Sequence, residues 1–322
     1  MKILIPGGTG QVGRVLTRAL RAKGHEFVIL SRRPDASRGE IRWDGKTIGA
    51  WADELDGADV VINLAGRSVD CRYNRKNRET ILDSRVNSTR VVGEAIARAA
   101  KPPRVWLQAS TATIYAHRFD ADNDETTGVL GGNETNAPSA WRFSIEVAKA
   151  WERTLDEANV PATRRIKMRS AMTMSPDRGG IFDVLLKLVR WGLGGASGGG
   201  RQFVSWIHEE DFVRAVEWLI EHDEISGVVN VASPSPLPNA DFMRTIREAW
   251  GIRVGLPASA WMLAVGTRLL RTESELILKS RRVVPGVLLQ SGFEFLHPTW
   301  PEAARELCRV RRTRGRTAAC FF

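Results

Sequence analysis

Residues 2–13 read Lys-Ile-Leu-Ile-Pro-Gly-Gly-Thr-Gly-Gln-Val-Gly. The run up to Pro6 is mainly apolar and predicts a buried β-strand, and the glycines after it predict a tight turn into a helix. Gly7 can adopt a backbone conformation closed to residues with a Cβ, Gly10 lets the main chain approach a pyrophosphate, and Gly13 lets the helix pack closely on the strand. The unpaired N–H groups at the helix N-terminus favour an anion at this turn.

The sequence around the turn decides between a cofactor-binding turn and a purely structural one. A helix is predicted from Val12 to Lys23, with apolar residues along one face, and Gly24 ends it. Residues 25–30 read as a second apolar strand, which completes a βαβ unit within about thirty residues. This context favours dinucleotide binding. The predicted cofactor contacts in the turn are Gly7, Gly10, Gln11 and Val12.

The residues after the second strand distinguish NADP(H) from NAD(H). An NAD-preferring site places Asp or Glu there to bind the ribose hydroxyls, whereas this chain has Ser31, Arg32 and Arg33. A guanidinium group can hold phosphate oxygens in a bidentate fork and stack on adenine. We therefore predict that these three residues bind the adenosine 2′-phosphate of NADP(H). A solvated basic turn, which Pro34 and Asp35 would also fit, is the alternative.

Strands and helices continue to alternate along the next part of the chain. After a short helix over residues 50–55, the pattern predicts a strand at 58–64, a long helix at 75–100 and a strand at 105–110. Such alternation implies right-handed crossovers and a parallel sheet with helices on both faces. The predicted fold class is α/β, a doubly wound parallel sheet of the Rossmann type.

In a doubly wound sheet, ligands bind beyond the carboxyl ends of the strands. Four segments should therefore meet at one crevice, and they are residues 7–13, 31–33, 63–66 and 110–115. In the third of these segments, the predicted cofactor contacts are Asn63, Ala65 and Gly66.

The regular alternation weakens beyond residue 170. We predict an NADP(H)-binding Rossmann domain at 1–170, a substrate lobe at 171–308 and a basic, disordered tail at 309–322. Single strands of the substrate lobe can return to the main sheet. The tail has five arginines and no acidic residue, so it carries half of the net charge of +10. Because the excess charge concentrates there, we do not expect nucleic acid as a partner.

The composition is that of a soluble globular protein, with 322 residues of which 43% are hydrophobic and 26% charged. No apolar run approaches the ~18 residues that span a bilayer, and the glycine turn comes too early for a secretory signal. We expect a cytoplasmic monomer or homodimer without membrane attachment. The cysteines, Cys71, Cys308 and Cys320, are odd in number and widely spaced, which argues against a disulfide framework or a zinc site.

These landmarks resemble the extended short-chain dehydrogenase/reductase superfamily. Its pattern is matched by the glycine turn, by Asn63-Leu64-Ala65-Gly66 after the third predicted strand and by residues 110–115 after the fourth. A narrower resemblance is to the SulA-type NAD(P)-dependent epimerase branch, often described as nucleoside-diphosphate-sugar epimerases. It rests on residues 83–90, 175–180 and 200–208, on Asp211, and on a C-terminal helical segment between Leu256 and Phe293.

The resemblance also exposes a missing catalytic pair. It implies a tyrosine whose phenol exchanges a proton with the substrate, and a lysine four positions later that assists the phenol and binds the nicotinamide ribose. The chain has two tyrosines, Tyr73 and Tyr115, and neither is followed by lysine at that spacing. The helix expected at residues 140–152 has Lys149 as its only lysine. We assign Lys149 to the cofactor ribose, with an exposed surface lysine as the alternative.

Other site residues follow from the same resemblance. It implies that Thr111 holds the substrate oxygen. Tyr115 matches the tyrosine that closes the same loop and is the second predicted catalytic residue, with a place in the pocket wall as the alternative. We predict no metal site, because His208 is too isolated, with neither His117, His222 nor any cysteine at ligand spacing.

The sequence thus predicts an NADP(H)-binding protein that acts as an epimerase or oxidoreductase on a small sugar-nucleotide-like or carbonyl substrate. Arg85, on the long helix, can reach an anionic substrate, with a structural salt bridge as the alternative. The missing pair favours a second class, an NADP(H)-binding regulatory or sensor protein with little or no catalysis. A third, weaker class is an adaptor whose arginine tail binds acidic partners.

Overall fold

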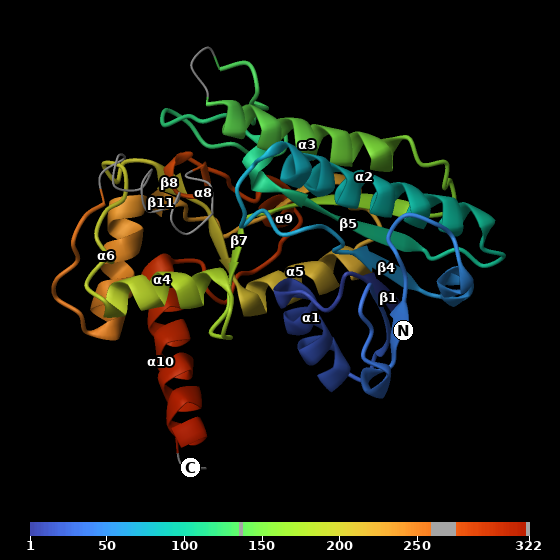
Figure 1. The fold of residues 1–322 in the computed structure, drawn as a ribbon, viewed down its shortest axis with the longest axis horizontal. Helices are drawn as coiled ribbons and strands as arrows, with labels where there is room; N and C mark the ends of the chain where they lie inside the picture. Colours follow the sequence, from blue (N-terminus) through green and yellow to red (C-terminus); the bar gives the residue numbers. More distant parts are fainter. Residues whose placement is uncertain (135–137, 259–274, 320–322) are drawn as a thin grey trace. The chain divides into compact units, whose positions relative to one another are not determined.

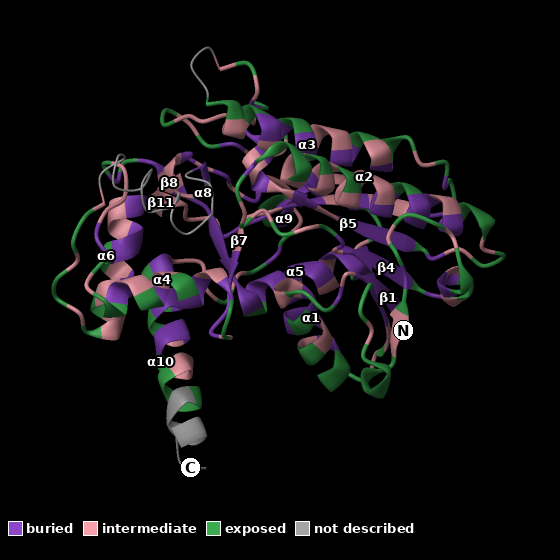
Figure 2. Cartoon of the chain, in the orientation of Figure 1, coloured by how far each residue is buried: buried purple, intermediate pink, exposed green. Residues whose placement is uncertain are grey.

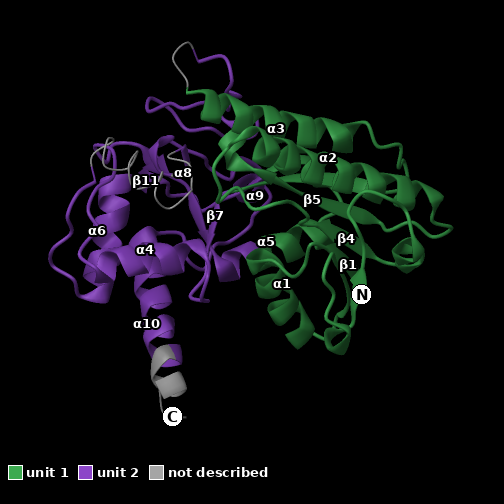
Figure 3. Cartoon of the chain, viewed as in Figure 1, with its two compact units in different colours: residues 1–114, 138–170, 213–229 green, residues 115–137, 171–212, 230–322 purple. Residues whose placement is uncertain are grey.

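The computed structural model (Figure 1) describes residues 1–134, 138–258 and 275–319. The chain divides into two compact units, and each unit is assembled from separate stretches of sequence (Figure 3). The first unit comprises residues 1–114, 138–170 and 213–229, and the second comprises residues 115–137, 171–212 and 230–322. Among the described helices, none has both the length and the apolar character that crossing a membrane requires.

Seven strands form the sheet of the first unit. They are β1 (Lys2–Pro6), β2 (Glu26–Ser31), β3 (Glu40–Arg42), β4 (Val60–Asn63), β5 (Val105–Thr111), β6 (Arg164–Ser170) and β10 (Gly227–Val231). Their order is β10-β6-β5-β4-β1-β2-β3, and the neighbours from β6 to β3 pair in parallel. The carboxyl ends of β5, β4, β1 and β2 are therefore neighbours, and the predicted doubly wound α/β fold is confirmed.

Helices cover both faces of this sheet (Figure 1). On one face, α2 (Arg75–Arg98) and α3 (Ser139–Asp156) lie side by side. On the other face lie α1 (Gln11–Ala22) and α5 (Glu209–Glu221), where Lys23 forms an ion pair with Glu217 at 2.6 Å. The short 3-10 helices are η1 (Ala36–Arg38), η2 (Ala50–Leu55) and η3 (Ala112–Ile114).

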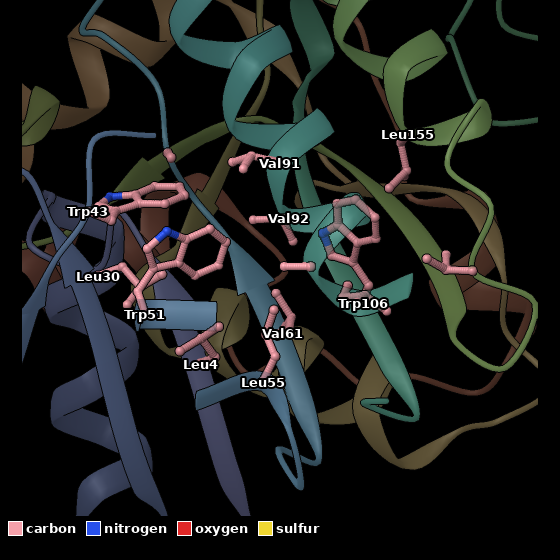
Figure 4. Packing of buried hydrophobic residues seen from close by; sticks show 14 residues of the cluster. Leu4, Leu30, Trp43, Trp51, Leu55, Val61, Val91, Val92, Trp106 and Leu155 are labelled. Atoms are coloured by element: carbon pink, nitrogen blue, oxygen red, sulfur yellow. The ribbon is translucent and has the colours of Figure 1, made fainter. Parts of the chain in front are cut away.

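The apolar strands are buried because helices cover the sheet on both sides, and Figure 2 shows β1, β4 and β5 almost wholly buried. Beneath α2, Leu4 and Val61 pack with Val92 in one hydrophobic cluster (Figure 4). Trp43 and Trp51 belong to the same cluster and meet edge to face, with ring centroids 5.4 Å apart. This packing fixes α2 over the centre of the sheet.

One strand of the first unit was not predicted from the sequence. Residues 40–42 form β3, which pairs in parallel with β2 at the edge of the sheet. The segment reads Glu-Ile-Arg and has no apolar run, so only its pairing with β2 reveals it as a strand. The third and fourth predicted strands are therefore β4 and β5.

The second unit has two small sheets and a separate core. β7 (Met172–Met174) pairs in parallel with β9 (Trp206–His208), and β8 (Phe203–Val204) pairs antiparallel with β11 (Leu237–Pro238). Its helices are α4 (Ile181–Arg190), α6 (Asn239–Trp250), α8 (Glu275–Leu278), α9 (Gly286–Gln290) and α10 (Trp300–Ala319). In the core, the rings of Trp300 and Phe242 stack with centroids 4.2 Å apart, which joins α10 to α6.

The predicted division at residue 170 differs from the observed units in two segments. Residues 115–137 belong to the second unit, and residues 213–229 return to the first because β10 joins the main sheet. The predicted C-terminal helical segment is described only in part, since residues 259–274 lie outside the described ranges.

Helix α10 continues through residues 309–319, where the sequence predicted a disordered tail. Arg311 forms an ion pair with Asp183 of α4. The guanidinium of Arg312 lies 4.5 Å from the centroid of the Trp250 ring. These contacts hold the start of the basic segment against α4 and the last residue of α6, an arrangement that composition alone could not reveal.

Candidate cofactor and catalytic site

Two glycines of the first turn are required by packing. Gly7 has φ +77°, and a Cβ there would lie 2.8 Å from the Cα of Ala65. Its N–H donates to the carbonyl oxygen of Leu30 at 2.9 Å. A Cβ at Gly13 would lie 2.2 Å from the carbonyl oxygen of Gly8, so only glycine lets α1 pack this closely. The turn after β1 thus contacts the ends of both neighbouring strands, β4 and β2.

Gly10 has no comparable packing requirement. A Cβ there would meet only the carbonyl oxygen of Gly7, at an ordinary distance of 3.6 Å. Gly10 is the N-cap residue of α1, so no side chain caps the first N–H groups of this helix, and its first turn contains no acidic residue. Beside it, the buried Nε2 of Gln11 has no hydrogen-bond partner in the described part of the chain, and Val12 is half-buried. Open space, unpaired helix N–H groups and an unsatisfied donor together fit an anionic group such as a pyrophosphate.

The end of β2 presents two uncommitted cations. Ser31 is buried, and its Oγ accepts a hydrogen bond from the N–H of Arg33 at 3.2 Å. Arg32 and Arg33 are exposed, and their guanidinium groups make no hydrogen bond or ion pair with any described residue. The nearby acid Asp35 is held by Ser37 and Arg38 instead. The two arginines therefore remain available to a phosphate.

Asn63 supports the site from within the protein. It is fully buried, and its Nδ2 donates to Oε1 of Gln108 at 3.0 Å. Its Oδ1 accepts the N–H of Ala65 at 3.1 Å. These two bonds fix the turn after β4 against β5 and hold Ala65 against Gly7. Both polar ends of the Asn63 side chain are thus used inside the protein, so the structure shows a positioning role for it.

Thr111 is the last residue of β5, where it pairs with Ser170 of β6. Its Oγ1 accepts the N–H of Thr113 at 3.2 Å, which orients the hydroxyl at the carboxyl edge of the sheet. Thr111 therefore stands on the predicted edge, one strand away from Asn63.

A buried ion pair underlies this edge and was not predicted. Arg169 donates from Nε and Nη2 to the two carboxylate oxygens of Glu152, at 2.8 and 2.7 Å. Ser110 donates its hydroxyl proton to the same carboxylate at 2.6 Å. The group connects α3 to β5 and β6 directly behind Thr111. The sequence contains no specific signal for it, because α3 and β6 each contain several other charged residues.

Helix α3 lacks the family tyrosine, yet a phenol from elsewhere reaches it. Ser144 of α3 donates to the hydroxyl of Tyr73 at 3.5 Å, and the Tyr73 ring packs edge to face on Phe143 with centroids 5.1 Å apart. Lys149, on the same helix, is half-buried. The loop before α2 thus supplies a phenol to the helix where the sequence shows none.

Arg85 lies between the turn after β4 and α3. Its Nη1 donates to the carbonyl oxygens of Arg67 and Ile81 at 3.0 and 3.1 Å, and its guanidinium lies 5.0 Å from the Trp151 ring centroid. It also contacts Gly66, where a Cβ would lie 3.3 Å from Cζ. Burial lowers the pKa of Arg85 to about 10. Arg85 thus packs against the predicted cofactor segment, bound to carbonyl groups in place of the expected carboxylate.

Tyr115 is the first residue of the second unit and is 2% exposed. Its hydroxyl donates to Oδ1 of Asn230 at 2.9 Å. A Cβ at Gly128 would lie 2.6 Å from the Tyr115 ring, so the ring is tightly packed on that side as well. This position agrees with a place in a packed wall, and a catalytic role for Tyr115 stays a prediction.

The view of His208 as isolated is wrong. The chain brings His297 against it, with imidazole centroids 3.8 Å apart, and Glu306 lies 2.9 Å from its Nε2. Asp211 accepts the backbone N–H groups of Leu296 and His297. The sequence separation of these residues hid the contact.

Comparison with known proteins supports the predicted family. The model of the NAD dependent epimerase/dehydratase family matches residues 3–232, and a domain of unknown function (DUF1731) matches residues 258–307. The epimerase family protein SDR39U1 of Homo sapiens is 30% identical over 314 residues, which is 95% of this chain and 99% of the relative. The epimerase family protein YfhF of Bacillus subtilis is 30% identical over 317 residues, which is 97% of this chain and 100% of the relative.

Solved structures give the same result. The crystal structure of human SDR39U1 (isoform 2) with NADPH matches with a TM-score of 0.84 at 30% identity, covering 96% of this chain and 99% of that chain. The nucleoside-diphosphate sugar epimerase from Corynebacterium glutamicum matches with a TM-score of 0.75 at 29% identity, covering 96% of this chain and 58% of that chain. The predicted resemblance and the nicotinamide class of cofactor are confirmed.

Proposed function

Because this chain belongs to the NAD dependent epimerase/dehydratase family, we propose that it binds NADP(H) and uses it for oxidoreduction or epimerisation of a sugar-nucleotide-like or carbonyl substrate. The observation that carries the cofactor choice is the pair Arg32 and Arg33, exposed at the end of β2 and uncommitted to any described residue. A 2′-phosphate gives both guanidinium groups an anion at the position where NAD-preferring proteins place an acid. NADPH in the human relative supports this choice.

The pyrophosphate would lie at Gly10 and the N-terminus of α1. Gly10 is the one glycine of the turn that its own packing does not require, and approach of a ligand to the backbone gives it a purpose. The N–H groups of the first helical turn would bind the phosphate oxygens, and Nε2 of Gln11 would gain the acceptor it lacks among the described residues.

The nicotinamide, when bound, supplies a site that accepts or donates hydride. In this chain Thr111 would hold the substrate oxygen through its hydroxyl, at the carboxyl edge of β5. A proton carrier is also needed, and Tyr73 joins Tyr115 as a candidate because its phenol lies beside Ser144 on α3. Lys149 on the same helix remains the proposed contact to the nicotinamide ribose.

The alternative function is an NADP(H)-binding sensor with little or no turnover. The observation that favours it is helix α3, where serine and phenylalanine stand near the place of the family tyrosine. In that case the cofactor would be bound for its effect on stability or on a partner, and Thr111 would have no chemical task.

Cofactor choice is tested by titrating Arg32→Asp with NADPH and with NADH, following tryptophan fluorescence. We expect NADPH affinity to fall at least tenfold, about 1.4 kcal/mol, with little change for NADH. Arg98→Asp, an exposed arginine at the end of α2, is the charge-matched control. Equal losses for both cofactors would contradict the assignment of the 2′-phosphate.

Turnover is tested by a screen of carbonyl compounds and sugar nucleotides with NADPH. If this protein is an enzyme that uses Thr111, the Thr111→Ala variant should lose turnover and still bind NADPH. Tyr73→Phe and Tyr115→Phe then identify the proton carrier, because only one should remove turnover without weakening NADPH binding. Tight NADPH binding without turnover of any substrate would favour the sensor.

A further inference from the structure

The second unit contains a compact group of metal-binding side chains. His208 ends β9 and is 1% exposed, Glu210 lies in the first turn of α5, and His297 lies in the segment before α10. One ligand atom of each, an imidazole nitrogen or a carboxylate oxygen, lies within 4.8 Å of the other two. The two imidazole rings are 3.8 Å apart, and 87 positions separate Glu210 from His297. The fold therefore collects three metal donors from distant parts of the sequence.

The hydrogen bonds of His208 define which nitrogen can bind a metal. The N–H of Glu210 donates to Nδ1 at 3.2 Å, so Nδ1 has a lone pair and no proton. Nε2 then has the proton and donates it to Glu306 at 2.9 Å. A histidine that donates one ring N–H to a carboxylate and turns the other nitrogen inward is the usual arrangement of metal-bound histidine.

The other side of the group is also held in place. Nε2 of His297 lies 3.0 Å from Oε2 of Glu210. The backbone N–H groups of Leu296 and His297 donate to the fully buried carboxylate of Asp211 at 2.7 and 2.9 Å. His297 is thereby fixed to the first turn of α5, and the flexible member is the half-exposed Glu210 side chain.

We propose that Nδ1 of His208, the carboxylate of Glu210 and Nε2 of His297 bind one divalent transition-metal ion, with Glu306 orienting His208. Two imidazoles and one carboxylate are a ligand set typical of Zn²⁺, which leaves a fourth position for water. Ca²⁺ and Mg²⁺ prefer oxygen ligands, so two nitrogens select against them. The ion displaces the Glu210 N–H from Nδ1 and replaces the direct contact of Glu210 with His297.

Such an ion would join the end of β9, the start of α5 and the segment before α10, and Glu306 extends the connection into α10 itself. A ligand that binds only the folded state stabilises it in proportion to the logarithm of its concentration. The metal would thus be a structural ion that stabilises the folded second unit, independently of the proposed NADP(H) chemistry.

The test uses the full-length protein after treatment with EDTA and gel filtration. We titrate it with Zn²⁺ against a chromophoric chelator and expect one tight equivalent together with a rise in the thermal midpoint. His297→Ala should weaken binding at least 100-fold, and Glu306→Gln should weaken it by about 10- to 100-fold, as loss of an orienting carboxylate does. Glu210→Gln is the second ligand variant, because its exposed side chain can be changed with little risk to folding.

Two control variants separate this site from adventitious binding. His222→Ala changes a histidine that directly follows α5, whose ring stacks on Trp218 and lies outside the group, and this variant should bind Zn²⁺ as the parent protein does. Cys71→Ser removes the half-buried free thiol and should have no effect. The proposal is overturned if His297→Ala and Glu210→Gln retain full affinity, or if Cys71→Ser abolishes binding.

Discussion

Removal of the buried carboxylate of Glu152, behind Thr111, should greatly lower the free energy of unfolding. Glu152 and Arg169 have side chains 9% and 8% exposed, and the arginine donates to both carboxylate oxygens. Glu152→Ala removes the carboxylate that accepts two hydrogen bonds from a guanidinium that cannot lose its proton, and leaves Ser110 without its acceptor. Breaking a buried pair from one side costs about 3–5 kcal/mol. For a chain of this size, the thermal midpoint should fall by about 4–7 °C.

A double substitution separates the cost of an unpaired charge from the value of the pair. Glu152→Leu together with Arg169→Met removes both charges and fills the space with apolar groups. Because replacing a whole buried pair in this way is often neutral or stabilising, the double variant should unfold within about 2 kcal/mol of the parent protein. The single variants Glu152→Leu and Arg169→Met, which complete the cycle, should each be destabilised like Glu152→Ala.

Equilibrium unfolding in urea, followed by tryptophan fluorescence, measures all four proteins of this cycle. Strong coupling is expected, since the effect of the double variant should be far smaller than the sum of the single effects. The reasoning fails if Glu152→Ala loses less than about 1 kcal/mol, or if the two single effects add, because either result means that Arg169 finds solvent or another partner.

Three further predictions follow from other contacts. Gly13→Ala should lower the free energy of unfolding by about 2–3 kcal/mol, because its Cβ would lie 2.2 Å from a carbonyl oxygen. Gly10→Ala should lower it by about 1 kcal/mol or less. In thermal melts with NADPH, however, the Gly10→Ala variant should lose most of the stabilisation that the cofactor gives to the parent protein. Arg311→Ala should lower the thermal midpoint by loosening α10 from Asp183, and an unchanged midpoint would mean that the docked tail adds no stability. Burial lowers the pKa of Lys279 from its usual 10.5 to about 8. The unfolded chain therefore binds more protons in this window, so the free energy of unfolding should rise from pH 8 to 10.5, and Lys279→Met should remove that rise in urea titrations at each pH.

Local patterns in the sequence were sufficient to predict the backbone of the first βαβ unit. The turn at residues 7–13 and the arginines after β2 lie within one βαβ unit, where the periodicity of a few neighbouring residues determines the backbone. The fold class followed from the same alternation. Asn63 illustrates the limit, since its place was predicted but its task inside the sheet depends on Gln108, a residue of the next strand.

Contacts between distant segments could not be read from the sequence. Tyr73 reaches Ser144, and His208 meets His297, only because helices and strands bring them together in three dimensions. Arg311 gives a third case, because it lies in an arginine-rich run with no acids nearby in sequence and pairs with Asp183 on another helix. Composition gives the number of charged residues, but only the folded structure shows which of them form ion pairs.

The exposed position of Arg32 and Arg33 has a consequence for how this family can diverge. Both side chains are exposed at the end of β2, and neither is engaged by a described residue, so replacing them should alter the folding free energy by only about 0.5 kcal/mol. Under the proposed assignment of the 2′-phosphate, cofactor preference would be a property of the surface, separable from the architecture beneath it. Substitutions at these two positions would then shift the choice between NADP(H) and NAD(H) without first acquiring stability elsewhere to tolerate the change.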